Sequence, residues 1–169
     1  MRRFVRRSDL GIIIGCIFIF ALFSLWNPQQ WFNWGTISNI GQYTAILGLL
    51  AIGQTFVILI REIDLSVGSV YGIVGITFIG AAFIGYADGS FGATMELSAI
   101  AAAVLGGCHL TGGRISLIGT LFGAFMLRGI QSFLILLAVQ PQWYILVVGL
   151  IVVLASLADR TLTRFALKK

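Results

Sequence analysis

Six apolar stretches alternate with short polar segments along the chain. A helix rises about 1.5 Å per residue, so about 20 residues are needed to cross about 30 Å of hydrocarbon. Most of the stretches approach or exceed that length. They cover residues 10–26, 37–60, 67–86, 97–110, 115–139 and 143–158. This pattern predicts an all-α integral membrane protein with about six transmembrane helices, folded as a single membrane domain over residues 1–169.

Polar residues interrupt the apolar pattern at a few defined places. Pro28 breaks the helix at the first connection, residues 27–34, where the tryptophans are residue types that suit the lipid interface. Two further interruptions, near 61–66 and 106–114, predict broken helical segments. The stretch 97–110 is the shortest, and it could be re-entrant instead of spanning.

Composition also indicates a membrane protein. The chain is 59% hydrophobic and 10% charged, with a mean hydropathy of +1.01, which lies far from the balance of soluble domains. The net charge of +5 could suggest nucleic-acid binding. Such binding needs cations gathered on one soluble face, whereas here they flank apolar runs, so nucleic acid is excluded as a partner.

The cations are distributed asymmetrically if six spans are threaded through a membrane. With the N-terminus in the cytoplasm, ten of the eleven cations fall on the cytoplasmic side. They are Arg2, Arg3, Arg6, Arg7, Arg61, Arg114, Arg160, Arg164, Lys168 and Lys169. This positive-inside pattern predicts that both termini are cytoplasmic. A cleaved signal peptide is the alternative for residues 1–26, but residues 21–25 offer no small-x-small cleavage site, so we favour a retained helix.

Asp64 and Ser66 lie in a polar break between two apolar runs. An ionisable group beside hydrocarbon is costly unless a partner, water or backbone geometry offsets it. One interpretation is that either residue caps the helix beginning near Val67, where a side-chain oxygen accepts from free backbone N–H groups. The other is a discontinuous helix that lines a translocation path, with Gly68 at its start.

Glycines mark a second break and three helix faces. Gly106, Gly107, Gly112 and Gly113 fall within nine residues and predict that the helix is broken there. No Gly-Lys-Ser/Thr ending follows, which argues against a phosphate-binding loop and nucleotide hydrolysis. Glycine pairs four residues apart lie on one helix face and favour close helix packing. These pairs are Gly11 with Gly15, Gly68 with Gly72, and Gly119 with Gly123.

Arg128 is the one cation inside an apolar run. It could snorkel to the interface, pair with a carboxylate, or face a polar cavity. Cys16 and Cys108 lack metal-ligand spacing and are interpreted as buried small residues, and His109 is interpreted as a packed or interfacial histidine. The sequence contains no recognisable nucleophile–base pair, carboxylate dyad or metal cluster, so we expect no enzyme activity, no catalytic residue and no metal.

Two long motifs resemble the permease subunits of ribose-type ABC importers, a family that carries sugars and related small polar solutes. The N-terminal motif is LGLLAIGQTFVIL at 47–59 followed by IDLSVGS at 63–69. The C-terminal motif begins with ELSAIAAAVLGG at 96–107 and continues through GGR at 112–114, GT at 119–120 and GA at 123–124. The resemblance covers nearly the whole chain apart from the link near residues 84–95.

The resemblance implies a bacterial plasma (inner) membrane permease that binds no cofactor itself. ATP would be bound by a separate cytoplasmic ATPase subunit, and the solute would be delivered by a periplasmic binding protein. A second permease subunit would complete a homodimer or heterodimer. Asp64, Ser66, Gly68 and the four glycines of the second break would act as hinges or line the path, and Arg128 stands where the family has small residues.

The resemblance also implies that the chain is shortened, because family members are about twice as long and have about ten membrane segments. Residues 1–86 resemble the N-terminal part of the permease and 96–169 the C-terminal part, with 87–95 as the junction. The segment that docks the ATPase is missing. The alternative function is therefore a non-transporting membrane fragment that packs against a full-length permease, or a decayed gene product.

Overall fold

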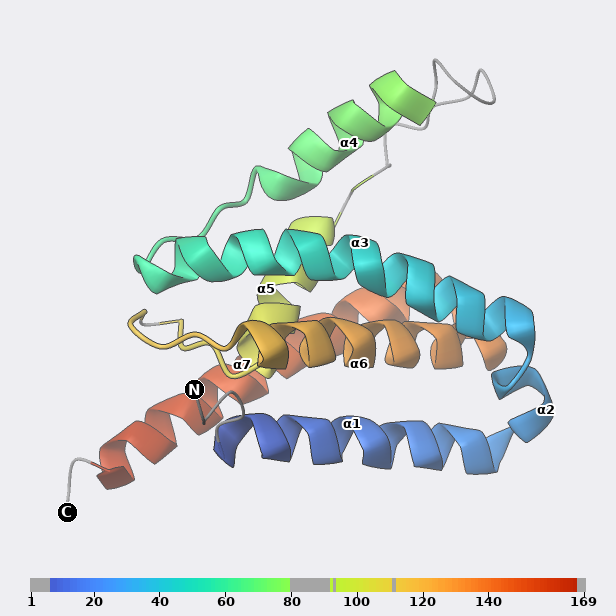
Figure 1. Ribbon diagram of the computed structural model, residues 1–169, viewed down its shortest axis with the longest axis horizontal. Helices are drawn as coiled ribbons and strands as arrows, with labels where there is room; N and C mark the ends of the chain where they lie inside the picture. The colour runs from blue at the N-terminus through green and yellow to red at the C-terminus, as the bar shows by residue number, and fades with distance from the viewer. Residues whose placement is uncertain (1–6, 80–91, 93, 111, 167–169) are drawn as a thin grey trace, which may run out of the picture.

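A computed structural model describes residues 7–79, 92, 94–110 and 112–166, and every regular element in this part of the chain is a helix. This confirms the all-α class predicted from the sequence. The helices are α1 (Arg7–Trp26), α2 (Pro28–Trp31), α3 (Trp34–Leu59), α4 (Val67–Ile79), α5 (Met95–Leu105), α6 (Leu117–Leu136) and α7 (Pro141–Ala166) (Figure 1).

Polar side chains set the helix boundaries at the predicted interruptions. The side chain of Asn27 accepts from the Gln30 N–H to cap α2, which has Pro28 in its first turn. Asn33 caps α3 by accepting from the Gly35 N–H at 2.9 Å. These residues satisfy backbone donors that a helix start leaves free. The connection 27–34 is therefore a compact capped corner.

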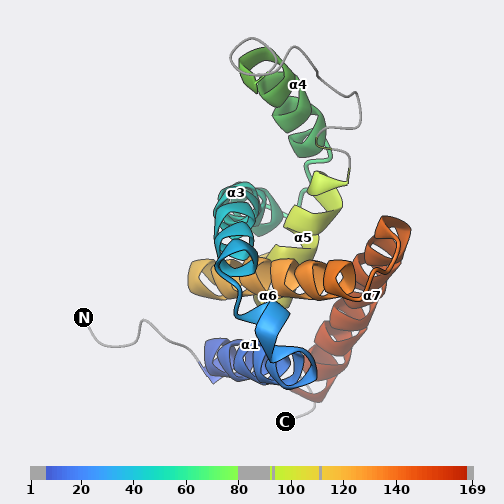
Figure 2. The same ribbon diagram turned by 90° about the vertical axis from the view of Figure 1, so that its right-hand side faces the viewer.

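The core lies where α5 passes between α3, α6 and α7. α5 contributes the fully buried alanines Ala99, Ala101, Ala102 and Ala103, and Leu47 of α3 and Leu127 of α6 pack beside them. Figure 2 shows α5 crossing behind α6, with α3 to its left and α7 to its right. Small side chains let the surrounding helices approach α5 closely, so this short helix is the centre of the bundle.

Glycines bring α5 and α6 into direct backbone contact. A Cβ atom added at Gly123 would collide with the Ala102 carbonyl, and one added at Gly119 would collide with the carbonyl of Gly106. The predicted packing role of the pair Gly119 and Gly123 is therefore confirmed. At Gly11 and Gly15, no described residue lies within 4 Å of a Cβ placed at either position, so the packing role of this pair stays a prediction.

α1 packs against α6 through aromatic rings. Phe20 stacks on Phe125 with ring centroids 4.4 Å apart, and Phe23 stacks on Phe133 at 3.9 Å. Trp31 closes this cluster edge-on and is only 4% exposed. The prediction that the tryptophans of the 27–34 connection suit the lipid interface was therefore wrong for Trp31, because three aromatic neighbours bury it.

Within the described residues, two helices, Trp34–Leu59 and Leu117–Leu136, are long and apolar enough to cross a membrane. Shorter apolar helices cover Leu10–Trp26, Met95–Leu105 and Gln142–Leu154. α5 has 11 residues, which extend about 16 Å, or roughly half the hydrocarbon thickness. The part of the predicted span 67–86 beyond Ile79, and most of the junction 87–95, lie outside the described residues. The division into 1–86 and 96–169 stays a prediction.

Candidate functional site

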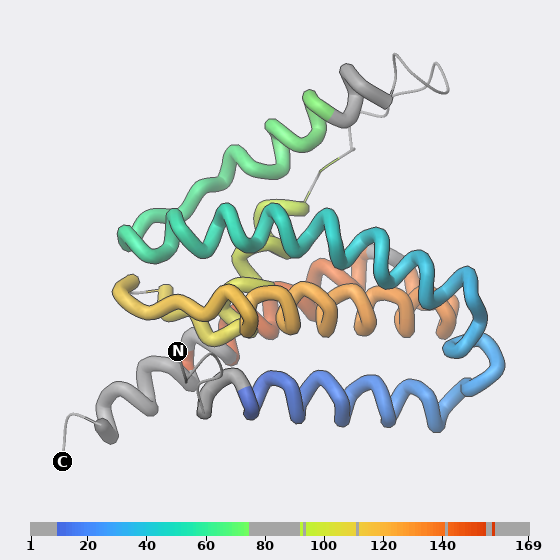
Figure 3. The backbone as a smooth tube through the Cα atoms, in the orientation of Figure 1, coloured from blue at the N-terminus to red at the C-terminus, as the bar shows by residue number. Residues whose placement is uncertain are grey.

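The two polar breaks meet at one end of the bundle. The first follows the end of α3, and the second connects α5 to α6 (Figure 3). The Gly113 N–H donates to the Leu59 carbonyl oxygen at 3.3 Å, which joins the breaks directly. Gly112 lies against Arg61, and a Cβ atom there would collide with the arginine side chain. Segments about 50 residues apart in sequence therefore lie side by side.

Positive φ angles explain why the second break contains so many glycines. Gly107, Gly112 and Gly113 have φ angles of +84°, +78° and +80°, a region that residues with a Cβ atom rarely adopt. The loop closes on itself, because the His109 N–H donates to the Arg114 carbonyl and the Gly112 N–H donates to the His109 carbonyl. The predicted break is confirmed, and α5 ends at Leu105.

Asp64 organises the turn that leads into α4. Its Oδ1 atom accepts from the Ser66 N–H at 2.7 Å, and the Ser66 carbonyl accepts from the Val70 N–H in the first turn of the helix. Asp64 therefore bonds to the residue before the helix, while Ser66 occupies the cap position. Hydrogen bonds from the Ser66 side chain and backbone stabilise the carboxylate and lower the pKa of Asp64 from its ordinary value.

Gln54 holds the backbone of Asp64 in place. Its side chain is fully buried on α3. With the amide oriented to satisfy both of its polar atoms, Gln54 donates to the Asp64 carbonyl at 3.1 Å and accepts from the Asp64 N–H at 3.0 Å. This pair of bonds replaces the helical bonds that Asp64 lacks, so the non-helical segment is anchored to the bundle.

A buried polar network connects the second break to both long helices. The hydroxyl groups of Thr55 on α3 and Thr120 on α6 lie 3.1 Å apart. The Cys108 Sγ atom lies 3.4 Å from the Thr120 hydroxyl and donates to that of Thr55 at 3.8 Å. Cys16 and Cys108 are both buried and unbonded to each other, as expected from the sequence. Cys108 thus has a structural role at this junction.

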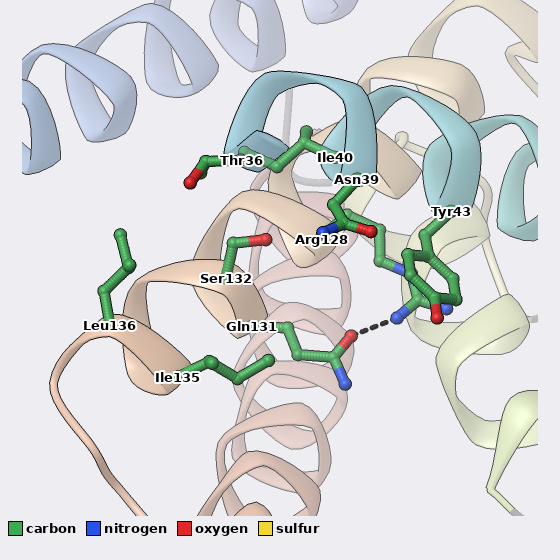
Figure 4. A pocket seen from close by; sticks show the side chains of 9 residues that line it. All are labelled: Thr36, Asn39, Ile40, Tyr43, Arg128, Gln131, Ser132, Ile135 and Leu136. Atoms are coloured by element: carbon green, nitrogen blue, oxygen red, sulfur yellow. Dashed lines mark hydrogen bonds between the residues drawn. The ribbon is translucent and has the colours of Figure 1, made fainter. Parts of the chain in front are cut away.

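A polar cavity of about 370 Å³ lies toward the opposite end, between the first half of α3 and the second half of α6. Figure 4 shows its lining, in which polar side chains outnumber apolar ones. The lining residues are Thr36, Asn39, Ile40, Tyr43, Arg128, Gln131, Ser132, Ile135 and Leu136. Of the three alternatives for Arg128, the structure shows the one in which it faces a polar cavity.

The Arg128 guanidinium has only neutral partners in the described chain. It donates through Nη1 to the Gln131 amide oxygen and through Nη2 to the Met95 sulfur, which is 3.9 Å away. Its carbon lies 4.6 Å from the centre of the Tyr43 ring, an arrangement typical of a cation–π contact. The Nε atom is buried without a hydrogen-bond partner among the described residues.

Comparisons with known proteins show that the chain is similar in sequence to import permeases. It is 33% identical over 140 residues to the autoinducer 2 import system permease protein LsrC of Salmonella typhimurium. The LsrC proteins of Escherichia coli strain K12 and Yersinia pestis are 37% and 40% identical, over 102 and 84 residues. The chain is homologous to importer permeases. This confirms the resemblance found in its motifs.

The aligned region covers a larger share of this chain than of its relatives. The match with the Salmonella protein includes 68% of this permease homologue but only 40% of the relative, and for Escherichia coli the shares are 60% and 29%. The chain thus spans about two fifths of the length of the Salmonella relative. No family model matches it, and no solved structure matches it.

The residues predicted as functional do not form one cluster in this permease homologue. Asp64, Ser66 and the glycines of the second break lie at one end of the bundle, whereas Arg128 lines the cavity toward the other. Gly68 faces the start of α5, where an added Cβ atom would collide with the Glu96 carboxylate. Their roles as hinges or path residues stay predictions.

Sequence reasoning missed Gln54 and Tyr43 as candidate site residues. Gln54 carried a usable signal, because a glutamine inside an apolar run must find hydrogen-bond partners. Tyr43 carried none, because its contact with Arg128 depends on how α3 and α6 are aligned.

Proposed function

We propose that this chain is the permease component of an ABC-type importer for a sugar-like small polar solute. It would act in the bacterial inner membrane. The observation that carries the proposal is its homology to autoinducer 2 import permeases over 68% of its residues. The relatives' substrate, autoinducer 2, is the first solute to test. The permease performs no chemistry and binds no cofactor, while a separate cytoplasmic ATPase binds ATP.

We further propose six membrane segments with both termini in the cytoplasm. α1 begins, and α7 ends, at the end of the bundle where the two breaks lie (Figure 1). Arg61 and Arg114 belong to those breaks, so the described cations outside the apolar runs share one end. The positive-inside pattern supports a cytoplasmic location for that end. The short α5 would cross only part of the bilayer, surrounded by protein.

The structure supports a path built around fixed breaks. The hydrogen bond from Gly113 to Leu59 and the clamp of Gln54 on Asp64 anchor non-helical backbone within a helical bundle. Non-helical backbone at membrane depth is tolerated where protein or a water-filled cavity satisfies it. Asp64, Ser66, Gly68, Gly106, Gly107, Gly112 and Gly113 would shape the cytoplasmic part of that path.

Affinity purification of the tagged chain from its source cells, in mild detergent, tests the proposal. We expect an ATPase subunit and a solute-binding protein to copurify, with a second copy of the chain or another permease completing the pair. Recovery of a full-length permease without an ATPase would overturn the proposal. It would favour the alternative of a non-transporting fragment, which the match to only 40% of a relative also supports.

A further inference from the structure

The cavity beside Arg128 contains a positive charge that the described protein does not neutralise. Among the described residues, the guanidinium is hydrogen-bonded to Gln131 and Met95 and lies over the Tyr43 ring, and none of these three side chains is a carboxylate. A cation enclosed by apolar helices is costly unless a partner or water compensates its charge. The guanidinium therefore attracts an anion into the space next to it.

The guanidinium is held in place while part of its hydrogen-bonding capacity stays unused. Gln131 engages Nη1, and the Tyr43 ring covers one face of the planar group. The remaining edge, Nε and Nη2, has only the Met95 thioether as a partner, and a thioether is a weak acceptor. Methionine is flexible, so a stronger acceptor can displace it. Nη2 can therefore donate to an oxygen of a carboxylate or phosphate, while Nε is buried without a hydrogen-bond partner among the described residues.

Neutral polar groups extend the site away from the charge. The side chains of Asn39, Gln131 and Ser132 line the same cavity and offer hydrogen bonds to hydroxyl groups (Figure 4). The volume of about 370 Å³ is within the range of small-molecule pockets. The cavity thus combines one fixed cation with several neutral donors and acceptors, which suits a small polyhydroxylated molecule bearing one anionic group.

We propose that this cavity binds a small polar solute carrying a carboxylate or phosphate group, with Arg128 as the anion-binding residue. In the predicted orientation the cavity opens on the periplasmic side, because it lies at the end opposite the two breaks. Only the role of the bound solute as transported cargo rests on the proposed function. Binding itself requires no ATP and no partner subunit.

Equilibrium dialysis with the detergent-purified chain tests the site, using radiolabelled ribose 5-phosphate and ribose as a pair that differs by one phosphate group. We expect ribose 5-phosphate to bind at least about tenfold more tightly than ribose, which is the effect of one hydrogen-bonded charge pair. Equal binding of the two, or no binding of either, would overturn the inference. This comparison needs no variant, so a folding defect cannot confuse it.

Variants then locate the site. Arg128→Gln should abolish the preference for ribose 5-phosphate, whereas Arg114→Gln, which removes an exposed arginine at the other end of the bundle, should retain it. Ser132→Ala should weaken binding of both sugars by a similar factor, because it removes a neutral contact. Loss of the preference in Arg114→Gln but not in Arg128→Gln would contradict the assignment.

A phosphate group could also belong to a lipid headgroup, so phosphatidylglycerol is included as a competitor. We expect ribose 5-phosphate to bind in lipid-free detergent and to be displaced only weakly by the lipid. Tight lipid binding without sugar phosphate binding would overturn the inference. A chain that binds ribose 5-phosphate but fails to copurify with an ATPase would instead leave the site standing and count against the importer function.

Discussion

Gln54 shows how a single side chain can stabilise a break in a membrane helix. Its amide supplies both hydrogen bonds that the Asp64 backbone would have made inside a helix. Gln54→Leu keeps the side-chain volume approximately and leaves two backbone groups unpaired, so we expect a loss of about 1–3 kcal/mol of stability. The measurement is the thermal unfolding midpoint in mild detergent. Gln42→Leu, an exposed glutamine on the same helix, should cause no loss, and equal effects would contradict the clamp.

The Asp64 carboxylate makes a pH-dependent contribution to the stability of the folded protein. In the folded protein, hydrogen bonds from Ser66 hold the pKa of Asp64 below its ordinary value of 3.8. The resulting stabilisation of the folded state is fully present above the unfolded pKa and is lost as the pH falls through the folded pKa. Wild type should therefore unfold at a higher temperature than Asp64→Ala near pH 7. The difference should shrink below about pH 4. A constant difference from pH 7 to pH 3 would show that the charge is not involved.

At the scale of elements, the crossing of α5 and α6 depends on glycine. Gly123→Ala places a methyl group against the Ala102 carbonyl, which should cost about 1–3 kcal/mol through overpacking. The test is the unfolding midpoint, followed by size-exclusion chromatography after heating. Gly53→Ala, where no described residue lies within 4 Å of the added atom, is the matched control on α3. It should leave the midpoint unchanged or raise it, and destabilisation of both variants would contradict the proposed contact.

The pattern of apolar residues predicted where the helices lie but not which faces they use. Breaks at 61–66 and 106–114 were predictable, because polar residues and clustered glycines interrupt a helix locally. At Gly11 and Gly15 the same spacing meets no described neighbour, because glycine spacing marks a smooth helix face but tertiary structure decides whether a neighbour covers it. The burial of Trp31 likewise depends on α1 and α6 meeting, and nothing in the residues 27–34 specifies that.

For the whole molecule, the distribution of cations predicts which end of the bundle faces the cytoplasm. Cysteines introduced at Glu62 and Arg114 should be protected from a membrane-impermeant maleimide in intact spheroplasts. Cysteines at Gln29 and Gln140, which are exposed at the opposite end, should react. Cys16 and Cys108 are buried and provide the unreactive background. The reverse labelling pattern would contradict the positive-inside assignment, and labelling at all four positions would exclude a membrane between the two ends.

We propose above that this permease homologue takes part in solute import. The direct measurement is solute uptake by right-side-out vesicles that contain the chain together with the ATPase, the binding protein and any second permease that copurify with it. Autoinducer 2, ribose and ribose 5-phosphate would be tested. We expect at least one of these solutes to accumulate in vesicles loaded with ATP but not in vesicles loaded with ADP, and we expect Gly123→Leu to abolish this uptake. The absence of ATP-dependent uptake of all three solutes, with the chain folded and its ATPase bound, would contradict the claim.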